Sequence, residues 1–420
     1  MAILRKKALI REQIQDITAL VAGNLSLHEV LDKLAAAAVD IVGVSACSIR
    51  LLDSESGDLS MRSTYGLSDS YRNKGPVTTD DPVIKEAFEG KAIVVNDMRT
   101  DSRVKYPIAT LNEGLVSQLT VAMTYKDKNI GVLRLYSGKS HRFTDTDVTI
   151  ARLIASQCAV AITNAKLYAK AVRGSEMEGQ MKLASVVQRR MLPHKAPQFK
   201  GFDISMMYRP CFMVGGDLYD FVQIDEDSFV VIIADVIGKG IPAALMMSMV
   251  KGALRAFLDC MHSCDQYSIE GVISRLNKFT CEQCSGGEFV TLFIGIINTA
   301  DKTLKYCNCG HEPTVLLRNS EITELNEGGM VLGVQEKVNH KIATISLQDD
   351  DVLLFYTDGL IDAVNFDNKI WGRPRLYETL LKCDKSSAKA LIHSLLGYRR
   401  RFTGLSPQQD DTSVVAIRVD

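Results

Sequence analysis

The chain has 420 residues, of which 46% are hydrophobic and 24% are charged, and its formal net charge is −1. This length is too great for one hydrophobic core and predicts two or three domains. The near-zero net charge gives no broad basic surface for nucleic acid or an anionic membrane. The longest apolar runs have the length of strands, and the basic start of the chain lacks the apolar core of a signal peptide. We therefore expect a cytoplasmic protein with no nucleic-acid or membrane partner.

The first part of the chain alternates helical and strand patterns. Apolar residues at near-helical spacing predict a helix over residues 5–24, and the capping box Ser26-Leu27-His28-Glu29 predicts that a second helix follows. Apolar alternation predicts five strands, with a hairpin turn between the last two. They lie at residues 47–51, 59–65, 92–95, 117–125 and 130–136.

The run Ile130-Gly131-Val132-Leu133-Arg134-Leu135-Tyr136, followed by Phe143-Thr144-Asp145-Thr146-Asp147, resembles the end of a GAF domain. The resemblance covers residues 10–168 and implies an antiparallel sheet flanked by helices. It also implies a sensor or dimerisation module that takes a small-molecule ligand, a protein input, or neither. The residues do not identify a ligand.

A helical pattern continues from Asp145 to about Arg190, and Pro193 marks its end. Its apolar residues form an imperfect seam, so residues 169–192 are predicted to be a coiled-coil-like linker. A helix this long cannot bury its apolar face on one small domain, and we expect it to pair with a second copy in a homodimer. A solvated single helix is the alternative.

Acidic residues at the ends of apolar runs are the main chemical signal of the second half. They are Asp217, Asp235, Asp358, Asp410 and Asp411, spread over nearly 200 residues. Acids at strand ends project into a crevice, where like charges repel one another unless a cation compensates them. Carboxylate oxygens suit Mg²⁺ or Mn²⁺, so the pattern predicts a metal site.

The same region predicts a helix over residues 243–257 and strands at 229–235, 289–298, 303–308 and 413–419. Two further strands, at residues 342–347 and 352–356, are expected to pair with each other. Asp220 is expected to be a surface or turn acid. Asp225 and Asp227 are also expected to be surface or turn acids.

Several ordered motifs resemble the bacterial sporulation-protein-E branch of the metal-dependent (PPM, type 2C) serine/threonine phosphatases. They are Gln188-Arg189-Arg190-Met191-Leu192-Pro193, Val214-Gly215-Gly216-Asp217, Asp235-Val236-Ile237-Gly238-Lys239-Gly240, Asn308-Cys309-Gly310-His311, Thr357-Asp358-Gly359 and Asp410-Asp411. The resemblance implies that residues 193–420 form an α-β-β-α sandwich, giving an α+β chain overall. It implies two Mn²⁺ or Mg²⁺ ions and attack of water on a phosphorylated protein. The expected substrate is a STAS-fold anti-sigma-factor antagonist in a partner-switching pathway.

The resemblance also implies roles for single residues. Asp235 and the backbone carbonyl of Val236 would bridge both ions, Asp358 and Asp410 would hold one, and Asp217 would act on the other. Asp411 would be a ligand or a supporting residue. Lys239 would bind the substrate phosphate or be a solvated loop lysine, and His311 would protonate the leaving serine or be a structural turn residue.

Two other functions compete with this reading. Gly215-Gly216-Asp217 is similar to the Gly-Gly-Asp of diguanylate cyclases, although it continues differently, as Leu218-Tyr219-Asp220-Phe221. Alternatively, the acids hold a structural cation in a non-catalytic scaffold. The spacing of Cys281/Cys284 and of Cys307/Cys309 is compatible with a zinc site, but free cysteines in a reducing compartment are the expected state.

Overall fold

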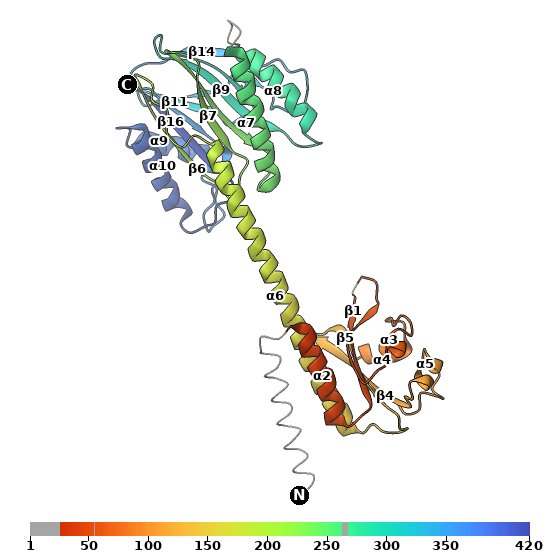
Figure 1. Cartoon of the computed structure of the whole chain (residues 1–420). Helices are drawn as coiled ribbons and strands as arrows, with labels where there is room; N and C mark the ends of the chain where they lie inside the picture. The colour runs from red at the N-terminus through yellow and green to blue at the C-terminus, as the bar shows by residue number, and fades with distance from the viewer. Residues whose placement is uncertain (1–25, 54, 263–267) are drawn as a thin grey trace. The chain divides into compact units, whose positions relative to one another are not determined.

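The computed structural model describes residues 26–53, 55–262 and 268–420, and the chain divides into two compact units between Ser175 and Glu176 (Figure 1). The helix predicted over residues 5–24 lies outside the described residues.

The first unit is built on a five-stranded antiparallel sheet with the strand order β2-β1-β5-β4-β3. Its elements are α2 (Leu27–Val42), β1 (Ala46–Leu52), β2 (Leu59–Tyr65), α3 (Asp69–Arg72), α4 (Pro82–Phe88), β3 (Ile93–Val95), α5 (Pro107–Asn112), β4 (Ser117–Tyr125), β5 (Lys128–Ser137) and the first part of α6 (Asp145–Met191). The predicted capping box at Ser26 is present and starts α2. All five predicted strands are confirmed.

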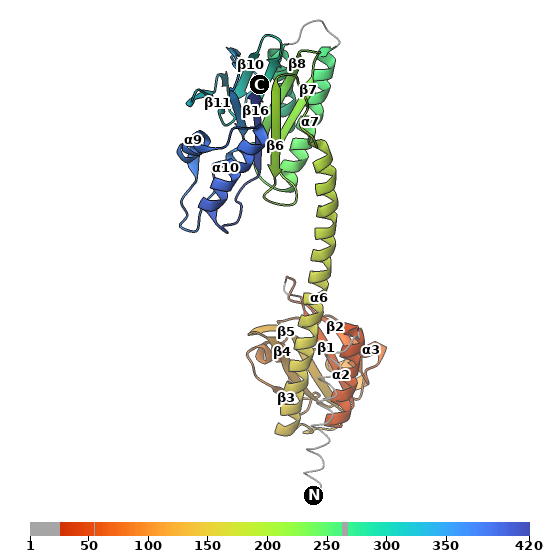
Figure 2. The same cartoon turned by 90° about the vertical axis from the view of Figure 1, so that its left-hand side faces the viewer.

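The two faces of this sheet are covered differently. Helix α2 and the start of α6 pack on one face, where Leu34, Ile49, Leu133 and Ile154 share a buried core. The short helices α3, α4 and α5 lie over the other face (Figures 1 and 2). The sequence did not predict these three helices, because each has seven residues or fewer and is too short to show a helical period.

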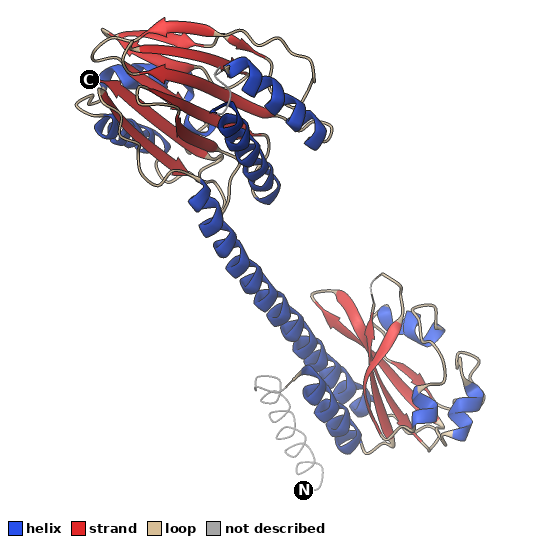
Figure 3. Cartoon of the chain, turned by 45° about the horizontal axis from the view of Figure 1, so that its top comes forward, coloured by secondary structure: helices blue, strands red, loops and turns tan. Residues whose placement is uncertain are grey.

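The second unit is an α-β-β-α sandwich, as expected (Figure 3). One sheet has the strand order β13-β10-β9-β8-β7, with β14 also paired to β10, and the other has the order β12-β11-β15-β16-β6. The strands are β6 (Phe202–Arg209), β7 (Leu218–Gln223), β8 (Ser228–Val236), β9 (Val290–Asn298), β10 (Thr303–Cys309), β11 (Thr314–Arg318), β12 (Glu321–Leu325), β13 (Gly328–Gly329), β14 (Ala343–Ser346), β15 (Val352–Tyr356) and β16 (Thr412–Val419).

Helices cover the outer faces of this sandwich. Helices α7 (Ile241–His262) and α8 (Ile269–Gln283) pack on the first sheet, and α10 (Ala388–Thr403), with α9 (Gly372–Lys382) beside it, packs on the second. The core between the sheets is apolar, and the rings of Phe293 and Phe355 meet across it edge to face, with centroids 5.3 Å apart.

The predicted pairing of strands 342–347 and 352–356 is wrong. Strand β14 pairs with β10, whereas β15 pairs with β11 and β16 in the opposite sheet. The intervening turn carries the chain from one sheet to the other. The carboxylate of Asp351 fixes this turn by accepting hydrogen bonds from the Gln348 amide and the Arg318 guanidinium.

Helices α6 and α7 each contain a stretch that is long and apolar enough to cross a membrane by length and composition alone. Core helices of globular domains pass the same test, and α7 packs on β8 and α8. The finding is therefore weak evidence for a membrane span.

Candidate active site

The acids of both sheets meet at one end of the sandwich. Asp217 immediately precedes β7, and its neighbour Leu218 pairs with Ala234, which immediately precedes Asp235 near the end of β8. In the other sheet, β15 pairs with β16, so that Asp358 follows the end of one strand and Asp410 precedes the start of the next. Antiparallel pairing therefore brings together acids that are far apart in the sequence.

A hydrogen bond joins the two sheets at this point. The Thr357 hydroxyl donates to Oδ2 of Asp217 over 2.8 Å, and Thr357 also accepts a bond from the Ser413 amide of β16. Asp217 is 1% exposed. Because a buried carboxylate with a fixed partner has little freedom, this bond sets the position of Asp217 relative to Asp358.

Burial and mutual repulsion raise the pKa values of the clustered acids. Burial and the charge of Asp235 raise the pKa of Asp217 well above its ordinary value. Burial and the charge of Asp358 raise the pKa of Asp235 to about 7, and burial and the charge of Asp410 raise the pKa of Asp358 to about 6. The carboxylates of Asp217, Asp235 and Asp358 are thus buried close to other negative charges, which disfavour their ionised forms.

Three glycines allow the backbone to pass close to these acids. A Cβ on Gly359 would lie 1.8 Å from the carbonyl oxygen of Asp411, and a Cβ on Gly215 would lie 2.2 Å from its Oδ2. A Cβ on Gly216 would lie 2.8 Å from the carbonyl oxygen of Val236. Only glycine fits these contacts, which place the Val236 carbonyl beside the loop that carries Asp217.

Asp411 is engaged with the backbone rather than with the other acids. Its Oδ1 accepts a hydrogen bond from the Cys211 amide over 2.6 Å, and its Oδ2 accepts one from the Gly216 amide over 2.7 Å. Both oxygens hold the loop that precedes β7. Of the two roles expected for Asp411, this geometry favours the supporting one.

Lys239 lies beside the clustered acids and is held there by two contacts. Its ammonium group is 2.6 Å from Oδ2 of Asp410 and also donates to the Gln409 carbonyl. It is thus a cation in direct contact with one of the predicted ligands, and its side chain is 38% exposed.

His311 is held in a turn by its neighbours. Its amide donates to the side chain of Asn308 over 2.7 Å, and its Nδ1 is 2.8 Å from the Thr291 hydroxyl. Burial lowers the pKa of His311 to about 4, so the ring is neutral at pH 7. Thr291 also donates to the Asp235 carbonyl, so His311 supports the backbone of a site acid through Thr291.

The sequence prediction for Asp220 is wrong. This residue is fully buried and pairs with Lys251, at 2.8 Å, and with Arg255, at 2.6 Å. Both cations come from α7, so Asp220 attaches that helix to β7. Asp225 and Asp227 are exposed, as expected.

Gln188 is a site residue for which the sequence analysis predicted no individual role. It lies near the end of α6, is 5% exposed, and makes two hydrogen bonds with the backbone of Gly215. Its Nε2 donates to the Gly215 carbonyl over 2.7 Å, and its Oε1 accepts from the Gly215 amide over 3.1 Å. The linker helix therefore contacts the loop that carries Asp217.

Comparison with known families assigns both parts of the chain. The description "Stage II sporulation protein E (SpoIIE)" matches residues 225–420, and the description "GAF domain" matches residues 24–163. The chain is a GAF domain followed by a SpoIIE-type phosphatase domain. The resemblance drawn from the motifs is confirmed, and the second half is a phosphoprotein phosphatase domain of a metal-dependent family.

Individual relatives agree with this assignment. The chain is 29% identical over 245 residues to phosphoserine phosphatase RsbU of Bacillus subtilis, covering 58% of this chain and 71% of RsbU. It is 27% identical over 277 residues to protein IcfG of Synechocystis, covering 60% of this chain but only 43% of IcfG. The SiaA-PP2C domain of Pseudomonas aeruginosa superposes with a TM-score of 0.54 at 18% identity, covering 60% of this chain and all of that domain, and so shares the fold.

The donor chemistry of the phosphatase crevice fits a hard divalent cation. The four carboxylates and the Val236 carbonyl offer only oxygen atoms, and Lys239 forms an ion pair with Asp410 beside them. In the arrangement described, however, no three Asp, Glu, His or Cys side chains are close enough to form a ready metal cage. Among the described residues, Cys281/Cys284 and Cys307/Cys309 likewise belong to no group of three possible metal ligands, so the structure does not support a zinc site there.

The raised pKa values predict how metal-free protein responds to pH. We expect Asp235→Asn to gain stability relative to the wild type as the pH rises from about 4 to about 7. The folded-state pKa of Asp235, about 7, lies above its ordinary 3.8, so the folded wild type binds extra protons in this window and loses stability as they leave. The lowered pKa of His311 makes stability rise between about pH 4 and pH 6.5, but it does so equally in both proteins and does not change their difference.

Urea unfolding followed by the emission of Trp371 measures this difference. Trp371 is the only tryptophan and lies in the phosphatase domain, so it reports that domain alone. A stability difference between the two proteins that stays constant or shrinks across this pH window would show that burial and neighbouring charges do not raise the pKa of Asp235.

Proposed function

We propose that this protein is a GAF-regulated, metal-dependent protein serine/threonine phosphatase. Its proposed substrate is a phosphorylated STAS-fold anti-sigma-factor antagonist in a partner-switching pathway. The observation that carries the proposal is the convergence of acids from both sheets at one end of the sandwich, joined by the Thr357–Asp217 hydrogen bond. The similarity to RsbU, which is named a phosphoserine phosphatase, supports the substrate class.

Asp217, Asp235, Asp358, Asp410 and the Val236 carbonyl would hold two Mn²⁺ or Mg²⁺ ions. Such ions supply Lewis-acid chemistry for in-line attack of water on a phosphoserine or phosphothreonine. The chain's own contribution is positioning. Asp411 holds the loop that carries Asp217, and Lys239, already beside Asp410, provides positive charge at the place where a phosphate would arrive.

The direct test is phosphate release from a phosphorylated STAS-domain protein by the full chain in the presence of Mn²⁺. We expect release that stops when the cation is removed and resumes when it is restored. If no phosphoserine or phosphothreonine protein loses phosphate under these conditions, the acids serve a non-catalytic scaffold instead.

The cyclase alternative finds no support in the fold. Gly215-Gly216-Asp217 belongs to a loop of the α-β-β-α sandwich and is held by Gln188 and Asp411. The residues that follow match the SpoIIE family. Incubation of the full chain with GTP should therefore give no cyclic product.

We further propose that the chain forms a homodimer through α6. Large apolar side chains are exposed along this helix, including Leu167, Met177, Leu183 and Val187, which are 54–70% exposed. Exposed apolar residues spread over several helical turns are costly in water and are covered when two such helices pair.

Substitution of Leu183 and Val187 by serine is expected to convert a dimer to a monomer, because it removes two apolar contacts per helix from the seam. Light scattering coupled to size-exclusion chromatography measures the mass directly. Lys170→Ser, at an exposed position of the same helix, is the control and should remain dimeric. A wild-type chain that is monomeric at micromolar concentration would contradict the proposal.

A further inference from the structure

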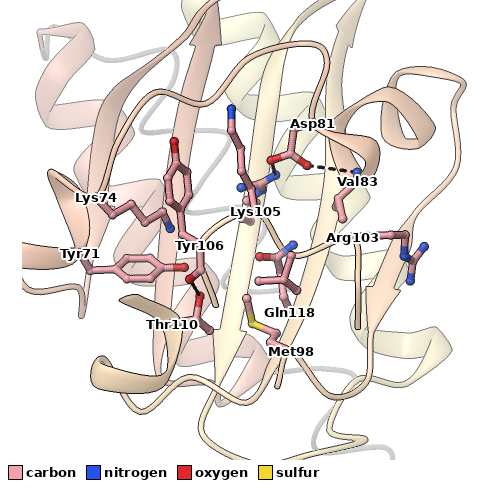
Figure 4. A pocket seen from close by; sticks show the side chains of 12 residues that line it. Tyr71, Lys74, Asp81, Val83, Met98, Arg103, Lys105, Tyr106, Thr110 and Gln118 are labelled. Carbon is pink, nitrogen blue, oxygen red and sulfur yellow. Dashed lines mark hydrogen bonds and ion pairs between the residues drawn. The ribbon is translucent and has the colours of Figure 1, made fainter. Parts of the chain in front are cut away.

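The face of the GAF sheet under the short helices contains two adjoining hollows. Figure 4 shows the side chains that line the inner one. The inner one is small and lies against β4 and β5, and the larger outer one opens beside α3 and α5. They share Tyr71, Lys74, Lys105 and Tyr106. A molecule in the outer hollow could therefore extend one end into the inner hollow.

The inner hollow is lined by a buried arginine with incomplete hydrogen bonding. Arg134 of β5 is 5% exposed, and its Nε has no hydrogen-bond partner. Its ion-pair partner is Asp81, at 3.4 Å, whose other oxygen accepts the Val83 amide and so caps α4. The charge of Asp81 is thus divided between the guanidinium and the helix cap, and the Arg134 donor set is not saturated.

A second buried arginine adds to the positive charge. Arg50, on the neighbouring strand β1, is also 5% exposed, donates to the Leu59 carbonyl, and has an Nε without a partner. A neutral carbonyl does not compensate its charge. Burying two guanidinium groups against one carboxylate is costly unless another anion is present.

Lys74 brings a third basic group to the same place. Its ammonium lies 3.2 Å from the centroid of the Tyr71 ring, and no carboxylate in the described parts of the chain forms an ion pair with it. Burial, together with the charges of Arg134 and Arg50, lowers the pKa of Lys74 to about 6. The lysine is held near like charges that disfavour its own protonation.

We propose that this hollow is a binding site for a small anionic metabolite that carries a carboxylate or phosphate group on a flat or apolar body. The anionic group lies in the inner hollow and accepts hydrogen bonds from Arg134 and Lys74. The body of the molecule lies against Tyr71, Tyr106 and Met98, which line the same space (Figure 4). Guanidinium groups bind planar oxyanions through paired hydrogen bonds, and such charge-assisted bonds are strong when water is excluded.

Calorimetric titration of the full chain with three probes tests the site. Benzoate and phenylphosphonate carry the two candidate anionic groups on one flat ring, and benzamide is their neutral analogue. We expect at least one of the two anions to bind and benzamide not to bind. Whichever anion binds more tightly identifies the group that the site prefers. Absence of binding by both anions, or equal binding of benzamide, would overturn the proposal.

Variants locate the binding. Lys74→Met keeps the length of the side chain and should weaken anion binding by roughly tenfold or more, the loss expected for one charge-assisted hydrogen bond. Lys85→Met, on the exposed side of α4, should bind as the wild type does. Lys74→Met replaces a partly buried amine, whose charge its surroundings disfavour, with an apolar side chain, and it should fold at least as well as the wild type. It therefore remains informative if Arg134→Gln does not fold.

Asp358→Asn separates this site from the phosphatase crevice. The variant should bind the anion as the wild type does, because Asp358 belongs to the other unit. Loss of binding in Asp358→Asn, or equal losses in Lys74→Met and Lys85→Met, would place the anion elsewhere and refute the assignment. Because these titrations require no turnover, their outcome does not depend on the proposed phosphatase activity.

Discussion

Asp358→Asn is expected to reduce phosphate release from a phosphoserine protein by on the order of a thousandfold, the equivalent of several kcal/mol of lost cation-assisted stabilisation. Asp358 follows β15 and faces the acids of the other sheet, and burial together with the charge of Asp410 raises its pKa to about 6. An amide at this position keeps the size of the side chain and removes the charge. The effect should therefore fall on the rate, while the fold remains intact.

The control for Asp358→Asn is Glu226→Gln, an acid-to-amide change at an exposed position of the same domain. It should leave phosphate release unchanged. Thermal unfolding should also show that metal-free Asp358→Asn is no less stable than the wild type, because the substitution relieves repulsion among buried carboxylates. Full activity in Asp358→Asn would remove this residue from the proposed site.

Gln188→Ala is expected to lower phosphatase activity by roughly ten- to a hundredfold, since it breaks two buried hydrogen bonds and leaves the Gly215 amide and carbonyl without partners, at a cost of about 1–3 kcal/mol each. Gln188 belongs to α6, and Gly215 belongs to the loop that ends in Asp217. Without this attachment, Asp217 should be positioned less well. We expect the concentration of Mn²⁺ that gives half-maximal activity to rise as well.

Two further variants identify the cause of this effect. Gln188→Glu keeps the acceptor for the Gly215 amide but loses the donor to its carbonyl, and it should fall between Gln188→Ala and the wild type. Lys182→Ala changes an exposed position one and a half turns earlier in α6 and should have no effect on activity. If Gln188→Ala retains the activity and Mn²⁺ requirement of the wild type, α6 does not control the Asp217 loop through this residue.

The acids of the phosphatase crevice could be predicted from the sequence because each follows or precedes an apolar strand. Antiparallel pairing then places strand ends together without any further information. Helical periodicity predicted α6, which spans Asp145–Met191 although its apolar seam is imperfect. It failed for β14 and β15, because the short turn between them is typical of a hairpin and nothing local indicates that the chain changes sheets there.

Other features depend on contacts that no local pattern reveals. Asp220 lies in a strand near several turn acids, and its burial becomes apparent only when α7 supplies Lys251 and Arg255. Gln188 is one polar residue on a long helix, and its partner is a glycine backbone 27 residues away. Arg50 and Arg134 appear as ordinary polar positions of alternating strands, and only the short helices over the sheet bury them.

The most direct measurement of the central claim is equilibrium binding of Mn²⁺ to the full chain, compared between the wild type and Asp235→Asn. If acids from both sheets form one hard-cation centre, the wild type should bind two ions per chain, and loss of the proposed bridging carboxylate should abolish or greatly weaken both. Equal Mn²⁺ binding by the two proteins, or no binding by the wild type, would contradict the account.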